Sequence, residues 1–339
     1  MLDLRPALNL LGNTLHAVPL LVLYLTDGCN SRCITCDIWR APRRNMPLEL
    51  AQQLAADSRV VGLKHVLFSG GEAMQHPHWS EIAGYFKAQG VSVGLLTNGL
   101  LLKKQAALVR QYVDTLTVSL DGATRETYQH IRGVDGLDLI LNGMRAVAEH
   151  VPITTRTTLQ RANFREMPQI VDVALAAGAR KVSFLAVDVA TTEAFGARPA
   201  ENLLSPALSA EDLPSFAAIL TALEQTHAVH FATGQIAESP IKLRRLYDYF
   251  AALHGMGEFP APQCNAPHLS AVIGVDGTIR PCYFLPDGGK IGSDGLLAAL
   301  NNLAMRDLRR AYRHGQRREC ARCVCPLYRS GKSLLTSGL

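Results

Sequence analysis

The chain has 339 residues, of which 48% are hydrophobic and 19% are charged, with a formal net charge of +5. This length accommodates one large α/β domain and a smaller appendage. No apolar run is long and uncharged enough to span a bilayer. Asp3, Arg5 and His16 interrupt the apolar N-terminal stretch, which disfavours a secretory signal. We therefore expect a cytoplasmic protein without a membrane span, and the scattered positive charge does not indicate nucleic-acid binding.

Six short β-branched or apolar runs are each followed by a helix-length segment. The predicted strands span residues 20–26, 65–69, 92–97, 115–120, 152–159 and 181–187. Strands that alternate with helices favour a parallel sheet with right-handed connections. The sequence therefore predicts an α/β fold, a partial (β/α)6 TIM-like barrel whose polar strand ends face one mouth.

The alternation of strands and helices ends at about residue 190. Residues 210–227 and 241–254 have the apolar spacing of helices. Farther on, residues 271–275 and 278–283 flank Asp276-Gly277, a pair typical of a tight hairpin turn. These patterns predict four parts: an N-terminal extension (1–19), the barrel (20–189), a helical connector (190–263) and a small C-terminal domain (264–339).

Eight cysteines fall into two groups with none between them. They are Cys29, Cys33 and Cys36 near the N-terminus, and Cys264, Cys282, Cys320, Cys323 and Cys325 in the last part of the chain. A reducing compartment disfavours disulfides and leaves thiols free for soft metals. The grouping predicts two separate metal sites.

The first group lies on a short loop directly after the first predicted strand. Three thiolates on a four-iron cubane leave one iron open to an added ligand, whereas a structural metal site usually has all its positions filled. A zinc site completed by Asp37 or by a distant histidine is the alternative interpretation of this spacing.

The spacing Cys29-x3-Cys33-x2-Cys36 after the first strand resembles the radical S-adenosylmethionine (SAM) superfamily, over residues 20 to about 187. Gly70-Gly71-Glu72-Ala73 after the second strand is similar to the Gly-Gly-Glu-Pro motif that binds the methionine amino group in that family, with Ala73 in place of proline. Thr35 stands where the family commonly has an aromatic residue. The resemblance implies a 4Fe-4S cluster, bound SAM, and a reductant such as flavodoxin or ferredoxin.

Further polar residues at strand ends are candidates for the SAM site. The resemblance implies that Ser119 and Asp121 contact the ribose hydroxyls or the methionine carboxylate, and Arg156 is a candidate partner of that carboxylate. Asn98 and Asn163 are further candidates. The structural alternative for Ser119 and Asp121 is an Asp-Gly turn with a capping serine, and Asn98 and Asn163 have the same alternative. For Gly70-Gly71 the alternative is a plain strand-to-helix turn, and for Arg156 it is an outward-facing surface arginine.

The second cysteine group resembles the SPASM and twitch extensions of the superfamily. A full SPASM domain has seven cysteines and two clusters, whereas five cysteines fit a twitch-like domain with one auxiliary 4Fe-4S cluster. We expect Cys264, Cys282, Cys320 and either Cys323 or Cys325 as its ligands. A structural zinc site with four thiolates is the alternative.

The resemblance implies reductive cleavage of SAM to a 5′-deoxyadenosyl radical that abstracts hydrogen from the substrate. With an auxiliary cluster as electron acceptor, the net reaction would be an oxidation. We expect a small metabolite as substrate, with a ribosomally made peptide as the second choice. Because only about 19 residues precede the first strand, a leader peptide would need a separate recognition partner. A zinc-stabilised binding protein without catalytic activity is the remaining alternative.

Overall fold

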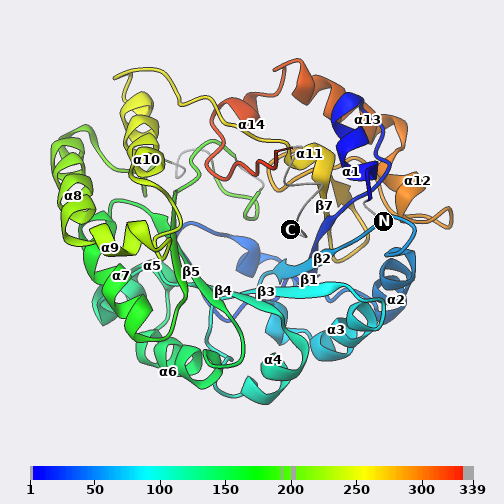
Figure 1. The fold of residues 1–339 in the computed structure, drawn as a ribbon, viewed down its shortest axis with the longest axis horizontal. Coiled ribbons are helices and arrows are strands. Elements are labelled where there is room, and N and C mark those ends of the chain that lie inside the picture. The colour runs from blue at the N-terminus through cyan, green and yellow to red at the C-terminus, as the bar shows by residue number, and fades with distance from the viewer. Residues whose placement is uncertain (1–2, 192–193, 200–203, 331–339) are drawn as a thin grey trace.

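A curved eight-stranded sheet forms the centre of the computed structural model, which describes residues 3–191, 194–199 and 204–330 (Figure 1). Its strand order is β6-β5-β4-β3-β2-β1-β7-β8. The strands are β1 (Leu20–Thr26), β2 (His65–Gly70), β3 (Ser92–Thr97), β4 (Thr115–Ser119), β5 (Ile153–Leu159), β6 (Lys181–Ala186), β7 (Ser270–Ile273) and β8 (Ile279–Arg280). The first six run parallel in the predicted order, which confirms the predicted α/β architecture.

Helices cover the outer side of the curve (Figure 1). The α-helices are α1 (Arg5–Leu8), α2 (Leu48–Asp57), α3 (Trp79–Ala88), α4 (Ala106–Tyr112), α5 (Arg125–Arg132), α6 (Leu137–Val147), α7 (Met167–Ala176), α8 (Leu213–Thr226), α9 (Ala228–Ala232), α10 (Pro240–Leu253), α11 (Ala266–Leu269), α12 (Leu296–Leu300), α13 (Leu303–Arg313) and α14 (Arg318–Ala321). None of the described helices is long and apolar enough to cross a membrane.

The core lies between the sheet and these helices. Leu21, Leu23 and Leu25 on β1 have no exposed surface, and Phe68 on β2 meets Phe86 on α3 edge to face with ring centroids 6.2 Å apart. Each large apolar side chain buried in this way stabilises the fold by about 1.5 to 3 kcal/mol. The packing therefore fixes the strands, and with them the loops at their C-terminal ends.

The predicted helices of the connector are present as α8 and α10, which pack against each other. The side chain of Ser239 caps α10 by accepting a hydrogen bond from the Lys242 amide at 3.4 Å. Proline at the first helical position suits this start, because its missing N–H needs no partner there. Parts of the predicted extension, connector and C-terminal domain lie outside the described residues, at positions 1–2, 192–193, 200–203 and 331–339.

The predicted hairpin near Asp276-Gly277 is confirmed by β7 and β8, which pair antiparallel. The sequence did not indicate that β7 also pairs with β1. The two strands run parallel, with Leu20 opposite Ser270 and Leu23 opposite Ile273. The C-terminal segment thus extends the same sheet that carries the first cysteine loop.

Candidate functional site

The loop after β1 carries Cys29, Cys33 and Cys36, and two of its backbone amides bind the end of α5. The amide of Arg32 donates to the Arg132 carbonyl and the amide of Ile34 to the Ile131 carbonyl, both at 3.0 Å. A helix end leaves carbonyl groups without helical partners, so these bonds satisfy groups on both segments. The loop is therefore attached to a helix that lies about a hundred residues away in sequence.

Gly70 and Gly71 lie against the backbone of the same loop. A methyl group on Gly70 would lie 2.4 Å from the Thr26 carbonyl oxygen, and one on Gly71 would lie 2.3 Å from that of Gly28. The Gly71 amide donates to the Thr26 carbonyl at 2.8 Å. Gly70 also has φ +115°, which side-chain-bearing residues rarely adopt. The described contacts of this pair thus serve close packing of two loops.

Glu72 is buried with 1% exposure, and its carboxylate accepts three hydrogen bonds. The donors are the Thr97 hydroxyl at 2.8 Å, the Asn98 amide at 2.7 Å and the Met74 amide at 3.2 Å. Burial raises the pKa of this carboxyl, and the hydrogen bonds oppose that rise. Because a carboxylate has about four acceptor positions, one remains for a cationic ligand.

Asn98 connects the end of β3 to the cysteine loop. Its side-chain amide donates to Asn30 Oδ1 at 2.7 Å and to Ser31 Oγ at 3.1 Å, and lies 3.9 Å from Cys29 Sγ. Its Oδ1 accepts from the Leu100 amide at 3.1 Å. Asn98 is therefore a tether of the loop in this structure.

Asp121 forms an ion pair with Arg132, the last residue of α5, in which the Asp121 side chain is 3% exposed and that of Arg132 is 13% exposed. The Arg132 guanidinium donates to Asp121 Oδ2 at 3.0 Å, and Asp121 Oδ1 accepts from the Thr158 amide at 2.7 Å. Burial raises the pKa of Asp121, opposed by the charge of Arg132. The sequence did not indicate a role for Arg132, because no pattern distinguishes it from the other 33 lysines and arginines.

Arg132 is also the cationic neighbour of the first three thiols. Burial raises the pKa of Cys29 and Cys33 and raises that of Cys36 to about 12, and the charge of Arg132 opposes the rise at all three. Without a metal these thiols would be neutral at pH 7, whereas a bound metal deprotonates its thiol ligands. Arg132 then lies where it can balance the negative charge of thiolates.

The other predicted SAM residues have different surroundings. Asn163 is buried and donates to the carbonyls of Asp121 and Thr158, both at 3.0 Å, while its Oδ1 accepts from the Gln160 amide. It joins the ends of β4 and β5. Ser119 ends β4 opposite Arg156 in the sheet, and its hydroxyl has no hydrogen bond to the described residues. Ser119 is therefore open to a ligand, whereas the Asn163 side chain is occupied.

Asn265, next to Cys264, binds the segment that follows Cys325. The Asn265 amide donates to the Leu327 carbonyl, and its side chain exchanges hydrogen bonds with the backbone of Arg329 at 2.7 and 3.0 Å. The Tyr312 hydroxyl donates to the Cys264 carbonyl. These bonds hold the segment after Cys325 beside the residue that follows Cys264.

The C-terminal thiols influence one another electrostatically. Burial raises the pKa of Cys282 to about 11 and that of Cys320 to about 12, and neighbouring thiols, Cys264 among them, add to both rises. The pKa values of Cys264 and Cys323 are raised by the same causes. All eight cysteines are free and partly buried. Among the described residues, no three His, Cys, Asp or Glu side chains are already gathered around one position for a metal ion.

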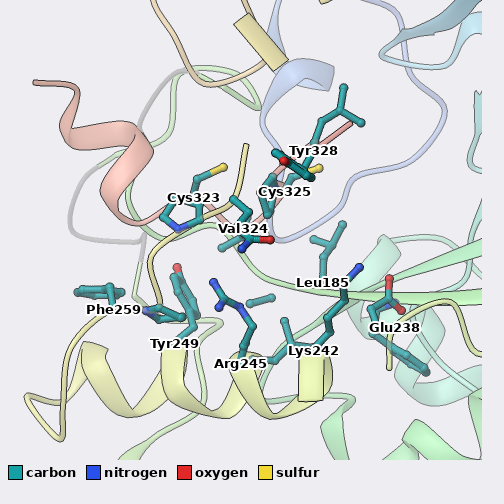
Figure 2. A pocket seen from close by; sticks show the side chains of 18 of the residues that line it. Leu185, Glu238, Lys242, Arg245, Tyr249, Phe259, Cys323, Val324, Cys325 and Tyr328 are labelled. Carbon is teal, nitrogen blue, oxygen red and sulfur yellow. The ribbon is translucent and has the colours of Figure 1, made fainter. Parts of the chain in front are cut away.

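A cavity of about 640 Å³ lies between β6, α10 and the segment that carries Cys323 and Cys325 (Figure 2). Arg156 on β5 lines it, and its Nη1 lies 4.0 Å from Cys325 Sγ. Arg156 faces this cavity, which excludes the outward-facing alternative. The guanidinium beside the first cysteine loop is that of Arg132, so the two arginines serve different parts of the site.

Two family models match the chain. Residues 23–174 match the radical SAM superfamily, and residues 264–324 match the SPASM iron–sulfur cluster-binding domain. The first match contains Cys29, Cys33 and Cys36. The second contains four of the five C-terminal cysteines and ends one residue before Cys325.

Two curated relatives each match about half of the chain. An AdoMet-dependent heme synthase of Methanosarcina barkeri is 30% identical over 171 residues, which cover 48% of this chain and 49% of that protein. A PqqA peptide cyclase of Streptomyces rochei is 29% identical over 182 residues, covering 52% and 49%. The chain thus matches about half the length of these relatives.

Solved structures support the fold over most of the chain. Streptococcus suis SuiB, in a crystal structure bound to the precursor peptide SuiA, superimposes with a TM-score of 0.64 at 16% sequence identity, covering 89% of this chain and 68% of that one. At this identity the likeness concerns the fold. The two family matches show that this chain belongs to the radical SAM superfamily, in its SPASM-containing subgroup.

Proposed function

We propose that this chain cleaves SAM reductively and removes a hydrogen atom from a substrate in the cavity between β6, α10 and the C-terminal cysteine segment. The observation that carries the proposal is that this cavity is bounded by Arg156 of the barrel and by Cys323 and Cys325 of the SPASM segment. A substrate there would lie beside the second cysteine group.

The residues at the first site fit an iron–sulfur cluster. Cys29, Cys33 and Cys36 are free thiols on one loop, and the buried Arg132 supplies positive charge beside them. When bound, this cluster and SAM supply a one-electron cleavage that yields a hydrogen-abstracting radical, and an auxiliary cluster supplies an electron acceptor that would make the net reaction an oxidation.

The chain's own side chains orient the cofactor and exclude water. Glu72 has one acceptor position left for the methionine ammonium, and the free hydroxyl of Ser119 suits a ribose or carboxylate oxygen. Asp121, Asn98 and Asn163 are occupied by protein partners, so we propose that they position the surrounding loops. Arg156 faces the substrate cavity, so we propose a role for it there.

For the auxiliary site we propose Cys264, Cys282, Cys320 and Cys323 as ligands. The SPASM match contains these four and ends before Cys325, which supports this choice. Cys325 would then be the spare thiol beside Arg156. Replacing Cys323 with serine should lower the iron content of the C-terminal site, whereas Cys325→Ser should leave it unchanged; equal losses would contradict the assignment.

The substrate class has two candidates. A cavity of about 640 Å³ lies within the range of small-ligand pockets, about 300 to 1,000 Å³, which supports a small metabolite. The name of the PqqA peptide cyclase supports a segment of a peptide as the second candidate.

The deciding experiment measures iron, sulfide and zinc in protein purified without oxygen, followed by an assay for 5′-deoxyadenosine with dithionite and SAM. Two occupied four-iron sites correspond to about eight irons per chain. We compare the wild type with a variant that carries Cys29→Ala, Cys33→Ala and Cys36→Ala, and with a Cys320→Ala, Cys323→Ala variant as the matched control. Cleavage should be lost in the first variant and retained in the second. Zinc in place of iron, or a wild type that does not cleave SAM, would refute the proposal.

A further inference from the structure

The side chains that line the cavity include more cations than carboxylates. The described residues that line it include four cations, Arg156, Lys242, Arg245 and Arg322, and one carboxylate, that of Glu238. The Glu238 carboxylate accepts from the Ser183 hydroxyl at 2.8 Å and from the Phe184 amide at 2.9 Å. It is therefore engaged in closing the edge of β6.

Helix α10 directs two of these cations into the cavity. Lys242, Arg245 and Tyr249 are spaced by three and four residues, so they lie on one face of the helix. Figure 2 shows Arg245 extending from α10 toward the segment that carries Cys323, Val324 and Cys325. One Arg245 nitrogen donates to the Ala261 carbonyl at 2.6 Å, and the other donors of the guanidinium have no hydrogen-bond partner among the described residues.

The neighbouring residue on α10 has a different environment. Arg244 is exposed, pairs with Glu224 of α8 at 3.2 Å and does not line the cavity. Two adjacent arginines of one helix therefore have different roles: Arg244 has an acidic partner on the surface, whereas Arg245 faces the cavity.

Arg156 adds a cation from the opposite wall. Its Nε is buried without a hydrogen-bond partner among the described residues, and its Nη1 has the weak contact with Cys325 Sγ described above. A buried donor without a partner is costly, and an acceptor oxygen of a bound anion would offset this cost. Aromatic and aliphatic side chains, among them Tyr249, Phe259 and Val324, also line the cavity.

We propose that this cavity is an anion-selective substrate site: it binds a molecule with a carboxylate or a phosphate group, held by Arg245, Lys242 and Arg156, whose apolar part contacts the aromatic wall. This inference rests on the proposed function, because that function makes the cavity the substrate site. It narrows both candidate substrate classes to anionic members.

The test measures binding to the cluster-loaded protein by equilibrium dialysis, a readout that is independent of SAM cleavage. Three probes share one apolar ring system: 1-naphthylacetate, 1-naphthyl phosphate and the neutral 1-naphthylacetamide. Hydrogen bonds to charged groups contribute about 1.5 to 3 kcal/mol, so we expect an anionic probe to bind about tenfold more tightly than the amide. The stronger of the two anions identifies the preferred group.

Single variants locate the binding site. Arg245→Gln and Lys242→Gln should each weaken binding of the preferred anion about tenfold and leave the amide unchanged, while the matched control Arg244→Gln should bind like the wild type. Equal binding of all three probes, or equal losses in Arg244→Gln and Arg245→Gln, would overturn the inference. A protein that binds anions in this way but does not cleave SAM would contradict only the proposed function.

Discussion

The two cysteine groups are held in different ways. The loop with Cys29, Cys33 and Cys36 is hydrogen-bonded to α5, packed against Gly70-Gly71 and tethered by Asn98. The segment from Cys320 to Cys325 has local backbone bonds, such as the Cys323 amide to the Cys320 carbonyl, and relies on Asn265 for its connection to Cys264. The contacts of the barrel therefore position the backbone of the first loop, whereas the second segment has fewer such contacts to hold it.

The largest loss of stability is expected when the ion pair beside the first cysteine loop is removed. In Asp121→Asn, Arg132 keeps its charge in a largely buried position but loses its partner, so the free energy of unfolding should fall by about 3 kcal/mol. Urea unfolding of the metal-free protein measures this loss. Arg125→Gln, which breaks the exposed pair with Asp135, is the control and should cost less than about 1 kcal/mol. Similar losses in both variants would show that the buried pair has no special role.

A substitution at Gly71 tests whether close packing holds the first loop. The methyl group of Gly71→Ala would collide with the Gly28 carbonyl, so we expect a loss of about 1 to 3 kcal/mol. Iron content should fall at the first site and stay constant at the second, as measured in variants that retain only one cysteine group. Gly12→Ala meets no atom within 4 Å and should behave like the wild type. Unchanged iron in Gly71→Ala would contradict the packing role.

Asn98 and Asn265 each hold one cysteine segment, so replacing each in turn tests the two segments in the same way. Asn98→Ala should lower the iron content of the first site, and Asn265→Ala that of the second, because each removes hydrogen bonds that hold one cysteine segment. Leaving their buried partners unsatisfied should cost about 1 to 2 kcal/mol in either case. Each variant is the control of the other, and iron loss at the opposite site would refute the assignment.

The smallest effect concerns the acid sensitivity of the C-terminal part. Burial, together with the charges of Arg309 and Arg313, lowers the pKa of His268 to about 4. Because the unfolded chain takes up a proton near pH 6.5 and the folded protein does not, stability should fall as the pH decreases from about 6.5 to about 4.

The variant His268→Gln should remove this part of the pH dependence. Between pH 7.5 and pH 6, the wild type should lose at most about 1 kcal/mol more of its unfolding free energy than the variant does. The exposed His78 is the control position, and His78→Gln should retain the wild-type slope. The same pH dependence of the unfolding free energy in the wild type and in His268→Gln would contradict the prediction.

The sequence predicted most of the barrel because each strand is a local pattern. The apolar run 20–26 and the cysteines after it identify β1 and its loop without knowledge of any distant contact. Arg132, Asn265 and the pairing of β7 with β1 could not be predicted in this way, because their importance comes from partners far away in sequence. The orientation of Arg156 likewise depends on which face of β5 lines the cavity, and the sequence of this strand does not reveal that face.

The parallel pairing of β1 with β7 has a consequence for how the two domains can be separated. Leu20–Leu23 use β7 as their outer neighbour, so a protein cut after residue 263 would present a row of apolar residues with unpaired backbone groups. Such an edge is a template for association between chains. The SPASM segment thus acts as a cover strand of the catalytic domain as well as a carrier of cysteines, and a truncated radical SAM domain should aggregate. Exchange of this segment between relatives would have to preserve the strand together with its metal ligands.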